Sequence, residues 1–338
     1  MFKLILILSA FIFISCGENK SKKVNNFDIL TDKQLLIKRE MMINSENDSL
    51  LYGISGFTTS MDGNIVVCDD VDFDIKKFDI MGKLINVYGS RGRGPNEFTL
   101  PPCQIAYNEK RNLYAVIERT SHVIKLFNGR FDFVKQILNA APVSDIVFDD
   151  ESNLITVTPP APQFFKTINI FDREGNLKSS FNPSNLTGEM LFDMCYLNYN
   201  SCKKKIILMY LFRNLIQVYD LNGKLNNEFS LPFLPLKAES EKFNNNSGLP
   251  TPVKGIPIKH IFWDISSDDQ GHLYILSGNY AKNGNKKEIY VTSTEGKLLR
   301  VINLDFESKF IYVPPKQHGY FYATSNKETA VGKYRMIW

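Results

Sequence analysis

One short segment decides the fold, because it recurs along the chain at a nearly constant distance. It is Phe171-Asp172-Arg173-Glu174-Gly175-Asn176-Leu177, and it returns as Tyr219-Asp220-Leu221-Asn222-Gly223-Lys224-Leu225. In each copy an apolar strand ends in a turn whose glycine supplies the positive φ of a tight hairpin, and another strand follows. Related turns contain Gly82, Gly129 and Gly296, so the five glycines lie 47, 46, 48 and 73 residues apart. The chain is therefore built from a structural repeat.

A second kind of turn precedes each of these glycines by about twenty residues. Examples are Asp62-Gly63-Asn64, Arg111-Asn112-Leu113, Ser152-Asn153-Leu154 and Gly271-His272-Leu273. Two hairpin turns in each period make four strands, which at this period is typical of a propeller blade. The long last spacing equals one period plus about 25 residues, and we assign the excess to an insertion at residues 231–259.

The two ends of the chain complement each other. Five full repeats extend from about Tyr52 to Phe306, and a sixth begins at Phe310 but lacks its outer strand. An unmatched strand pattern occurs at residues 34–43, and its pairing with the C-terminal strand would cover two exposed edges. We therefore predict an all-β fold, a six-bladed β-propeller with four-stranded blades whose last blade is closed by the N-terminal strand.

Composition agrees with this fold and excludes one class of partner. Of the 338 residues, 43% are hydrophobic and 22% charged, as in a soluble globular protein. The 25 Phe and 15 Tyr favour strands. The net charge of +4 comes from scattered residues, so there is no electrostatic case for nucleic acid.

The N-terminus has the features of a secretion signal. Met1-Phe2-Lys3 is followed by an apolar run at residues 4–14, and eleven helical residues span about 16 Å, short of a hydrocarbon core of about 30 Å. The run ends in Phe13-Ile14-Ser15-Cys16-Gly17, which resembles a bacterial lipobox. The resemblance implies cleavage before Cys16, lipidation of Cys16 and stable anchoring by several acyl chains. The alternative is an ordinary secretory signal that contains a cysteine.

These features divide the chain into three parts. We predict a lipoprotein signal peptide at residues 1–15, lipidated Cys16 and a flexible tether at residues 16–33, and the propeller at residues 34–338 with its insertion. Among lipoproteins, Gly17 after the cysteine points to the outer membrane, and the basic tether differs from acidic surface-export signals. We therefore expect an outer-membrane lipoprotein of the cell envelope that faces the periplasm.

One loop carries a resemblance to a known family. The sequence Gly92-Arg93-Gly94-Pro95-Asn96-Glu97-Phe98 follows an outer strand, and Asp62-Gly63-Asn64-Ile65-Val66-Val67 precedes it. Together they resemble NHL-repeat propellers and, more closely, the six-bladed β-propeller lipoproteins of Bacteroidetes. The resemblance covers residues 34–338 and implies the fold, but it implies little about activity because that family is largely uncharacterised.

Two sets of residues are candidates for ligand binding. Arg91 and Arg93 lie on the face that we expect to carry the insertion, although their loop can equally serve only to shape a turn. Alignment on the turns places Gln104, Asp145 and Asp264 at equivalent positions of the inner strands, with Asp193 as a fourth member. Such a ring could hold a cation or sugar hydroxyls, or it could only bind water and neighbouring backbone.

Catalytic and metal signatures are weak. The four histidines (His122, His260, His272 and His318) occupy different phases of the repeat, so we predict no histidine metal site. The chain contains no Gly-x-Ser-x-Gly motif. The cofactor is left unknown, and a structural or axial Ca²⁺ is not predicted. Cys195 and Cys202 flank a predicted hairpin turn and are the candidate disulfide, the alternative being reduced thiols.

These observations leave competing hypotheses of function. The first is an envelope-anchored binding or interaction module without catalysis, which holds a protein or a glycan on its insertion-bearing face. The second is a metal-assisted hydrolase or lyase resembling NHL-type propeller lactonases and lyases, with Asp145 and Asp264 near an axial metal. A third is a structural partner in an envelope complex. Fold alone does not choose between them.

Overall fold

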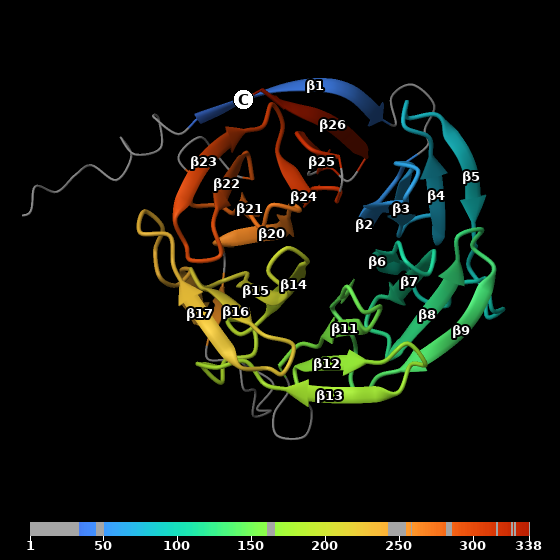
Figure 1. The fold of residues 1–338 in the computed structure, drawn as a ribbon, viewed down its shortest axis with the longest axis horizontal. Coiled ribbons are helices and arrows are strands. Elements are labelled where there is room, and N and C mark those ends of the chain that lie inside the picture. The colour runs from blue at the N-terminus through green and yellow to red at the C-terminus, as the bar shows by residue number, and fades with distance from the viewer. Residues whose placement is uncertain are drawn as a thin grey trace, which may run out of the picture.

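A computed structural model describes residues 34–44, 51–160, 166–242, 255–257, 259–281, 286–315, 317–325, 327 and 329–337. Every regular element in these residues is a β-strand, and none of them lies in a helix. Most of the strands form four-stranded sheets that stand radially around a central channel, and the others form one eight-stranded sheet and a hairpin (Figure 1). The predicted β-propeller fold with four-stranded sheets is confirmed.

Four of the sheets follow the chain order from the channel outward. They contain β2 (Ile54–Thr59), β3 (Ile65–Asp69), β4 (Asp74–Phe78) and β5 (Leu84–Tyr88); β6 (Pro102–Asn108), β7 (Leu113–Glu118), β8 (Val123–Asn128) and β9 (Phe133–Leu138); β10 (Asp145–Phe148), β11 (Leu154–Val157), β12 (Ile168–Phe171) and β13 (Leu177–Phe181); β14 (Cys195–Asn200), β15 (Lys205–Tyr210), β16 (Ile216–Tyr219) and β17 (Leu225–Phe229).

The remaining strands form an eight-stranded sheet and a small hairpin. The eight-stranded sheet has the order β20-β21-β22-β23-β1-β26-β25-β24. Its strands are β1 (Gln34–Asn44), β20 (Phe262–Ser267), β21 (Leu273–Ser277), β22 (Glu288–Thr292), β23 (Leu298–Asn303), β24 (Ser308–Tyr312), β25 (Tyr320–Ser325) and β26 (Ala330–Ile337). The hairpin pairs β18 (Ser240–Lys242) with β19 (Gly255–Pro257).

The N-terminal strand joins the two ends of the chain, as predicted. β1 pairs antiparallel with β26, from Leu36 opposite Ile337 to Asn44 opposite Ala330. It also pairs in parallel with β23 through Gln34 and Leu35, which the sequence did not indicate. β1 thus covers the outer edge of β26 over the length of that strand, and β23 in turn pairs with the first two residues of β1.

The predicted turn glycines adopt the required backbone geometry at four of the five positions. Gly82, Gly175, Gly223 and Gly296 have φ of 86°, 83°, 79° and 86°. In the shorter turn around Gly129 the left-handed position is taken instead by Phe131, with φ of 64°. Phe131 is buried and stacks on Tyr114 with ring centroids 4.3 Å apart, so packing compensates for the unfavourable backbone.

The hydrophobic core lies between the sheets and not within one layer. All residues of β3 and of β7 are buried, because a sheet neighbours each face of these strands, whereas the outer strand β5 is mostly exposed. One cluster joins Val66 and Ile75 to Ile105 and Val116 of the next sheet. Equivalent clusters join the later sheets in turn. The inner strands are thereby held rigidly around the channel.

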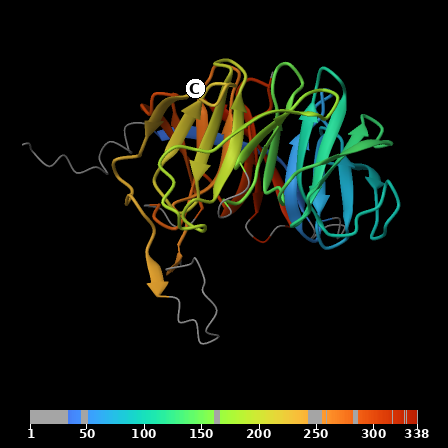
Figure 2. The ribbon, with the colours of Figure 1, turned by 90° about the horizontal axis from the view of Figure 1, so that it is seen from below.

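Connections alternate between two faces of the ring because successive strands are antiparallel. The insertion face, as we name it, carries the loops at residues 69–74 and 88–102 and the described residues of the insertion, 231–242, 255–257 and 259. The turn face carries the turns from first to second strands at residues 108–113, 148–154, 200–205, 267–273 and 312–320. Figure 2 shows the ring from its side, with the β18–β19 arm projecting away from it.

The insertion begins as part of the core. Leu231, Leu234 and Ala238 are buried in the cluster between β14–β17 and β20–β23. The Asn214 amide donates to the carbonyl oxygens of Leu231 and Leu234, at 2.7 and 3.1 Å. Only the later part of the insertion extends into the arm.

The predicted signal peptide, Cys16 and the tether lie outside the described residues. Within the part of the chain that the structure describes, no helix is long and apolar enough to cross a membrane.

Candidate functional site in the central channel

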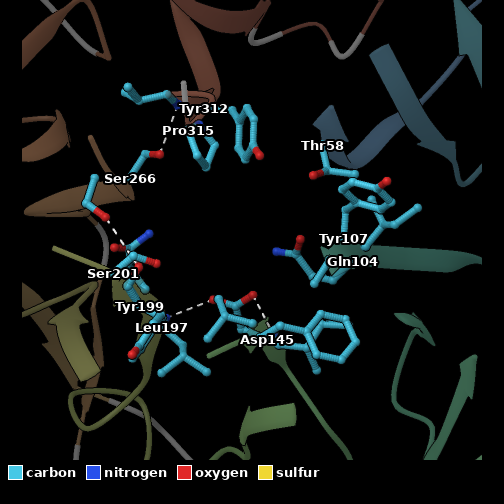
Figure 3. A pocket seen from close by; sticks show the side chains of 18 of the residues that line it. Thr58, Gln104, Tyr107, Asp145, Leu197, Tyr199, Ser201, Ser266, Tyr312 and Pro315 are labelled. Carbon is cyan, nitrogen blue, oxygen red and sulfur yellow. Dashed lines mark hydrogen bonds between the residues drawn. The ribbon is translucent and has the colours of Figure 1, made fainter. Parts of the chain in front are cut away.

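The channel contains a cavity of about 290 Å³ that opens on the turn face. Gln104, Asp145 and Asp264 lie near its inner end, and Asp150 and Ser201 belong to the turns at its mouth. Figure 3 shows side chains from several sheets around the open centre. The three inner-strand candidates thus line one cavity, which opens opposite the face on which we expected the ligand.

The two aspartates hold neighbouring inner strands together. Asp145 accepts the N–H of Ile146 at 2.9 Å and, from the next sheet, that of Leu197 at 2.8 Å. Asp264 accepts the N–H of Ile265 and that of Ile311, both at 2.8 Å. The same contact thus occurs at two junctions of the ring. It satisfies backbone donors on inner strand edges that would otherwise face the channel.

Burial changes the protonation of both aspartates. It raises the pKa of Asp145 to about 7, against the lowering effect of the N–H groups of Leu197 and Ile146. Burial also raises the pKa of Asp264 well above its usual range, and the charge of Asp145 adds to this increase. Near neutral pH the cavity therefore carries less negative charge than its residues suggest.

Two amides supply hydrogen-bonding capacity that the protein does not use. The Gln104 amide points into the cavity (Figure 3), and none of the hydrogen bonds among the described residues uses it. Asn198, from β14, also lines the cavity, and its Oδ1 is buried without a hydrogen-bond partner. A buried acceptor left unpaired is costly, and this oxygen can reach a donor in the cavity if the Asn198 amide turns toward it.

Asn198 was not predicted, although a signal for it existed. It belongs to a layer two residues farther along each inner strand than the predicted ring. The layer is Thr58, Ala106, Val147, Asn198, Ser266 and Tyr312, all of which line the cavity. Polar side chains in that layer replace the apolar residues expected of a buried inner strand. Of these, the Ser266 hydroxyl already accepts the N–H of Val313 at 2.9 Å.

The mouth of the cavity combines carboxylates with hydroxyl and aromatic groups. Asp150 accepts hydrogen bonds from the hydroxyls of Tyr199 at 3.1 Å and Ser201 at 2.7 Å. The Lys110 ammonium donates to the carbonyl oxygen of Asp150. Deeper in, Phe57 and Tyr312 meet edge to face with ring centroids 5.8 Å apart. The walls therefore offer apolar ring surface beside polar groups.

Asp193 does not join the ring. Its carboxylate lies 3.2 Å from the Arg213 guanidinium and accepts the N–H groups of Thr187 and Gly188. It precedes β14, and the position equivalent to Asp145 and Asp264 is Tyr196, directly before Leu197. The turns of this sheet misled the alignment because the loop before β14 is irregular.

Arg91 and Arg93 lie apart from the channel residues. Both are exposed, and Arg91 lies over the Phe73 ring at 5.2 Å. Their loop is explained by packing: Phe98 is buried between β2–β5 and β6–β9, and the Glu97 carboxylate accepts the N–H of Gly94 at 2.7 Å. A Cβ on Gly92 would approach this carboxylate to 2.0 Å. The loop at residues 92–98 therefore forms a structural turn.

The acidic loop at residues 69–74 is neutralised from within. Asp69, Asp72 and Asp74 place carboxylate oxygens close enough to share a cation. The Lys76 ammonium lies 2.8 Å from Asp69, 2.5 Å from Asp72 and 3.7 Å from Asp74. Lysine thus supplies the positive charge that a metal ion would bring.

Two histidines converge, contrary to our expectation, but away from the axis. His272 and His318 line one cavity of about 340 Å³ on the turn face. The Nδ1 atom of His272 lies 2.9 Å from Asp268, and that of His318 lies 3.3 Å from Asp269. Both occupy turns from first to second strands, so the phases of these two histidines do agree.

The candidate disulfide does not form in this structure. Cys195 and Cys202 are both free, the first buried and the second exposed. Cys195 begins β14 and Cys202 lies in the turn beyond its end, so a strand of roughly 16 Å separates them. Disulfides require Cα atoms within about 7 Å. Cys195 is therefore at the wrong end of the strand to flank the turn.

Comparison with known proteins shows the fold alone. No protein-family model and no curated protein matches the chain. Among solved structures, a streptogramin B lyase has a TM-score of 0.55 and 13% identity over 89% of this chain and 98% of its own. Virginiamycin B lyase from Staphylococcus aureus has 0.56 and 12% over 89% and 100%. A Bacteroides fragilis protein described as exported has 0.58 and 11% over 89% and 96%.

Proposed function

We propose that this chain is an envelope-anchored lipoprotein that binds a ligand in its central cavity without transforming it. The observation that carries the proposal is the contrast within the cavity. The Asp145 and Asp264 carboxylates are occupied by backbone N–H groups, whereas the Gln104 amide and the Asn198 oxygen are unused. Groups suited to catalysis are engaged in holding the fold, and groups suited to recognition are available.

The proposal includes six blades over residues 34–338. The eight-stranded sheet divides at the β23–β1 pairing into two runs of four strands, β20–β23 and β24–β25–β26–β1. Six hydrophobic clusters among the described residues alternate with the six sets of strands. Both observations support a ring of six units, the last closed by the N-terminal strand.

The proposed anchor places the cavity mouth on the side of the ring where the tether arrives. β1 begins beside Ile337, at the turn-face end of β26. The proposed tether at residues 16–33 reaches roughly 60 Å when fully extended. The lipobox-like sequence at Cys16 and the fold shared with an exported Bacteroides fragilis protein support an envelope location, with the periplasmic face of the outer membrane as the proposed site.

The proposal is tested by blocking the mouth of the cavity. The immobilised protein is incubated with glycan and peptide fragments released from purified bacterial envelopes, and retained molecules are identified by mass spectrometry. Ser201→Trp places a bulky ring at an exposed mouth position, while Arg93→Ala changes the insertion face. We expect retention by the wild type and by Arg93→Ala, and loss in Ser201→Trp. Equal retention by all three proteins would contradict a site in the cavity.

The competing hydrolase or lyase hypothesis has a separate test. Bound fragments are recovered and their masses compared with the input, and metal content is measured in the wild type and in Asp264→Ala. We expect unchanged masses and no stoichiometric metal. New product masses, or one tightly bound Ca²⁺ or Zn²⁺ per chain lost in Asp264→Ala, would replace binding with metal-assisted catalysis.

A further inference from the structure

We infer that the ligand of the central cavity is the end of an uncharged glycan, of one or two sugar rings, anchored by Gln104 and Asn198. This inference rests on the proposed binding function and adds the chemical class of the ligand. It draws on the size of the cavity, its hydrogen-bonding groups, its charge and the state of the surrounding strand edges.

The cavity is small for a ligand site. Its volume of about 290 Å³ lies at the lower end of the range of roughly 300–1,000 Å³ for small-molecule sites. It is also confined laterally by the inner strands of the ring (Figure 3). A terminal sugar or a disaccharide fits such a space, and the rest of a longer chain would leave through the mouth on the turn face.

The unused polar groups match hydroxyl groups. The Asn198 Oδ1 atom can only accept and has no partner, and a ligand donor reaches it when the amide turns toward the cavity that Asn198 lines. The Gln104 amide offers both donors and an acceptor from another sheet of the ring. Sugar hydroxyls donate and accept at once and can satisfy both amides. The ring surfaces of Phe57, Tyr312 and Phe148 can cover the apolar C–H faces of a sugar.

Charge in the cavity disfavours ionic ligands of either sign. The mouth is lined by three carboxylates and one ammonium (Glu109, Asp149, Asp150 and Lys110), and this excess of negative charge opposes anions such as uronic acids or phosphates. The two aspartates offer little to an ammonium group, because Asp149 already accepts from Glu151 and Asn153, and Asp150 accepts from Tyr199 and Ser201. An uncharged ligand avoids displacing these bonds.

The inner strand edges are closed to an added peptide strand at five positions. The N–H groups of Ile146 and Leu197 are bound by Asp145, those of Ile265 and Ile311 by Asp264, and that of Val313 by Ser266. Peptides that bind by strand addition need free main-chain groups on the sheet edge. The same side chains that hold the inner strands together thus favour a glycan over an extended peptide.

The experiment is a titration with defined sugars followed by protein-observed NMR. The probes are glucose, galactose, mannose, N-acetylglucosamine and their common disaccharides, with glucuronic acid as the anionic counterpart and trialanine as the peptide. We expect saturable binding of at least one neutral sugar and binding of glucuronic acid at least about tenfold weaker. Asn198→Leu and Gln104→Leu should each weaken the sugar by about tenfold, the effect of one lost hydrogen bond.

Two further variants keep the result interpretable. Asn198→Ser removes the amide with less change of shape, so it replaces Asn198→Leu if that protein has a lowered melting temperature. Arg93→Ala is the control on the opposite face and should leave sugar affinity unchanged.

Binding of no neutral sugar at about 20 mM, roughly the weakest affinity such a site would show, would overturn the glycan inference. So would equal sugar binding by wild type and both amide variants. If envelope fragments of another class still bind and Ser201→Trp still blocks them, the proposed binding function stands while the glycan inference fails. If neither the fragment-retention test nor the sugar titration shows binding, the proposed binding function and the glycan inference are both wrong.

Discussion

The two faces of the propeller differ in how they use their polar groups. On the insertion face, loops are long and the buried charges near them are paired: Lys76 with three aspartates, Arg213 with Asp193, and Lys125 with Glu118 at 3.0 Å. On the turn face, connections are short, yet the cavity behind them contains amide groups that no neighbour satisfies.

This difference teaches that the longer loops of this propeller are not where its unused hydrogen-bonding groups line a cavity. Long loops need internal bonds to hold their own backbone, and their charged residues are consumed in providing them. Short turns need one Asn or Asp side chain each to bind their N–H groups, as Asn108, Asp149 and Asn200 do, so side chains farther down the inner strands remain available. The proposed site therefore rests on hydrogen-bonding groups that line a cavity and lack a protein partner, and not on the insertion.

The largest expected effect follows from removing the lysine cation that pairs with the acidic loop at residues 69–74. Asp69 is fully buried, and Lys76 is its only ionic partner among the described residues. Lys76→Met leaves three carboxylates without a counter-charge, so we expect a loss of about 3–5 kcal/mol in the free energy of unfolding. Urea denaturation measures it. Lys77→Met, at the neighbouring position of β4, is the control and should change stability by less than about 0.5 kcal/mol.

Nearly unchanged stability in Lys76→Met would show that the loop tolerates unpaired charge. The insertion face, like the cavity, would then hold polar groups that need no protein partner, and the two faces would not differ in this respect.

The second test uses the pH dependence of stability to determine the protonation of Asp145. Its pKa is about 7 in the folded protein and near 3.9 when unfolded, so the folded state binds the proton more tightly. The stability contributed by this group is complete below about pH 4 and is lost as pH rises to 7, by at most about 4 kcal/mol. We expect Asp145→Asn to be less stable at pH 4 but to lose less stability toward pH 8.

Asp264 and Asp74 shift in the same direction and remain in the variant, so the measurement is the difference between the two pH profiles. Urea unfolding at several pH values provides them. Parallel profiles would show that Asp145 is ionised and solvated in the cavity.

Much of the fold was predictable because the repeat depends on turn residues that can be recognised locally in the sequence. The positive φ values at Gly175 and Gly223 follow from the sequence, and so does the pairing of β1 with β26. The parallel contact of β1 with β23 was not predictable, since it depends on how two edges approach in space. Phe131 likewise replaces Gly129 at the left-handed position because of long-range stacking.

The candidate site was predictable in position but not in role. Repeat phase placed Gln104, Asp145 and Asp264 around one channel. Which of them are occupied depends on backbone donors 47 and 52 residues away, at Ile311 and Leu197. Asn198 escaped notice because only the described cavity shows that its oxygen lacks a partner.

A third and smaller effect compares two asparagines of β14. Each has one unpaired buried amide atom, Oδ1 in Asn198 and Nδ2 in Asn200, but the oxygen of Asn200 accepts the N–H of Lys203 at 3.0 Å and supports the turn. We expect Asn198→Leu to leave the protein as stable or more stable by about 1 kcal/mol, and Asn200→Leu to destabilise it by about 1–2 kcal/mol. Thermal and urea unfolding measure both. A loss in Asn198→Leu equal to that in Asn200→Leu would mean that Asn198 serves the fold and not a ligand.

The smallest expected effect concerns the arginines first favoured as ligand contacts. Arg91 and Arg93 are exposed, and their loop is held by Phe98 and by the Glu97 carboxylate, so neither guanidinium is needed for folding. We expect Arg91→Ala and Arg93→Ala to change stability by less than about 0.5 kcal/mol and to leave ligand retention unchanged. In contrast, Glu97→Ala removes the carboxylate from the Gly94 N–H and should cost about 1–2 kcal/mol. Reduced ligand retention in either arginine variant, at unchanged melting temperature, would return the binding site to the insertion face, because an exposed cation without a structural role can affect retention only by contacting the ligand.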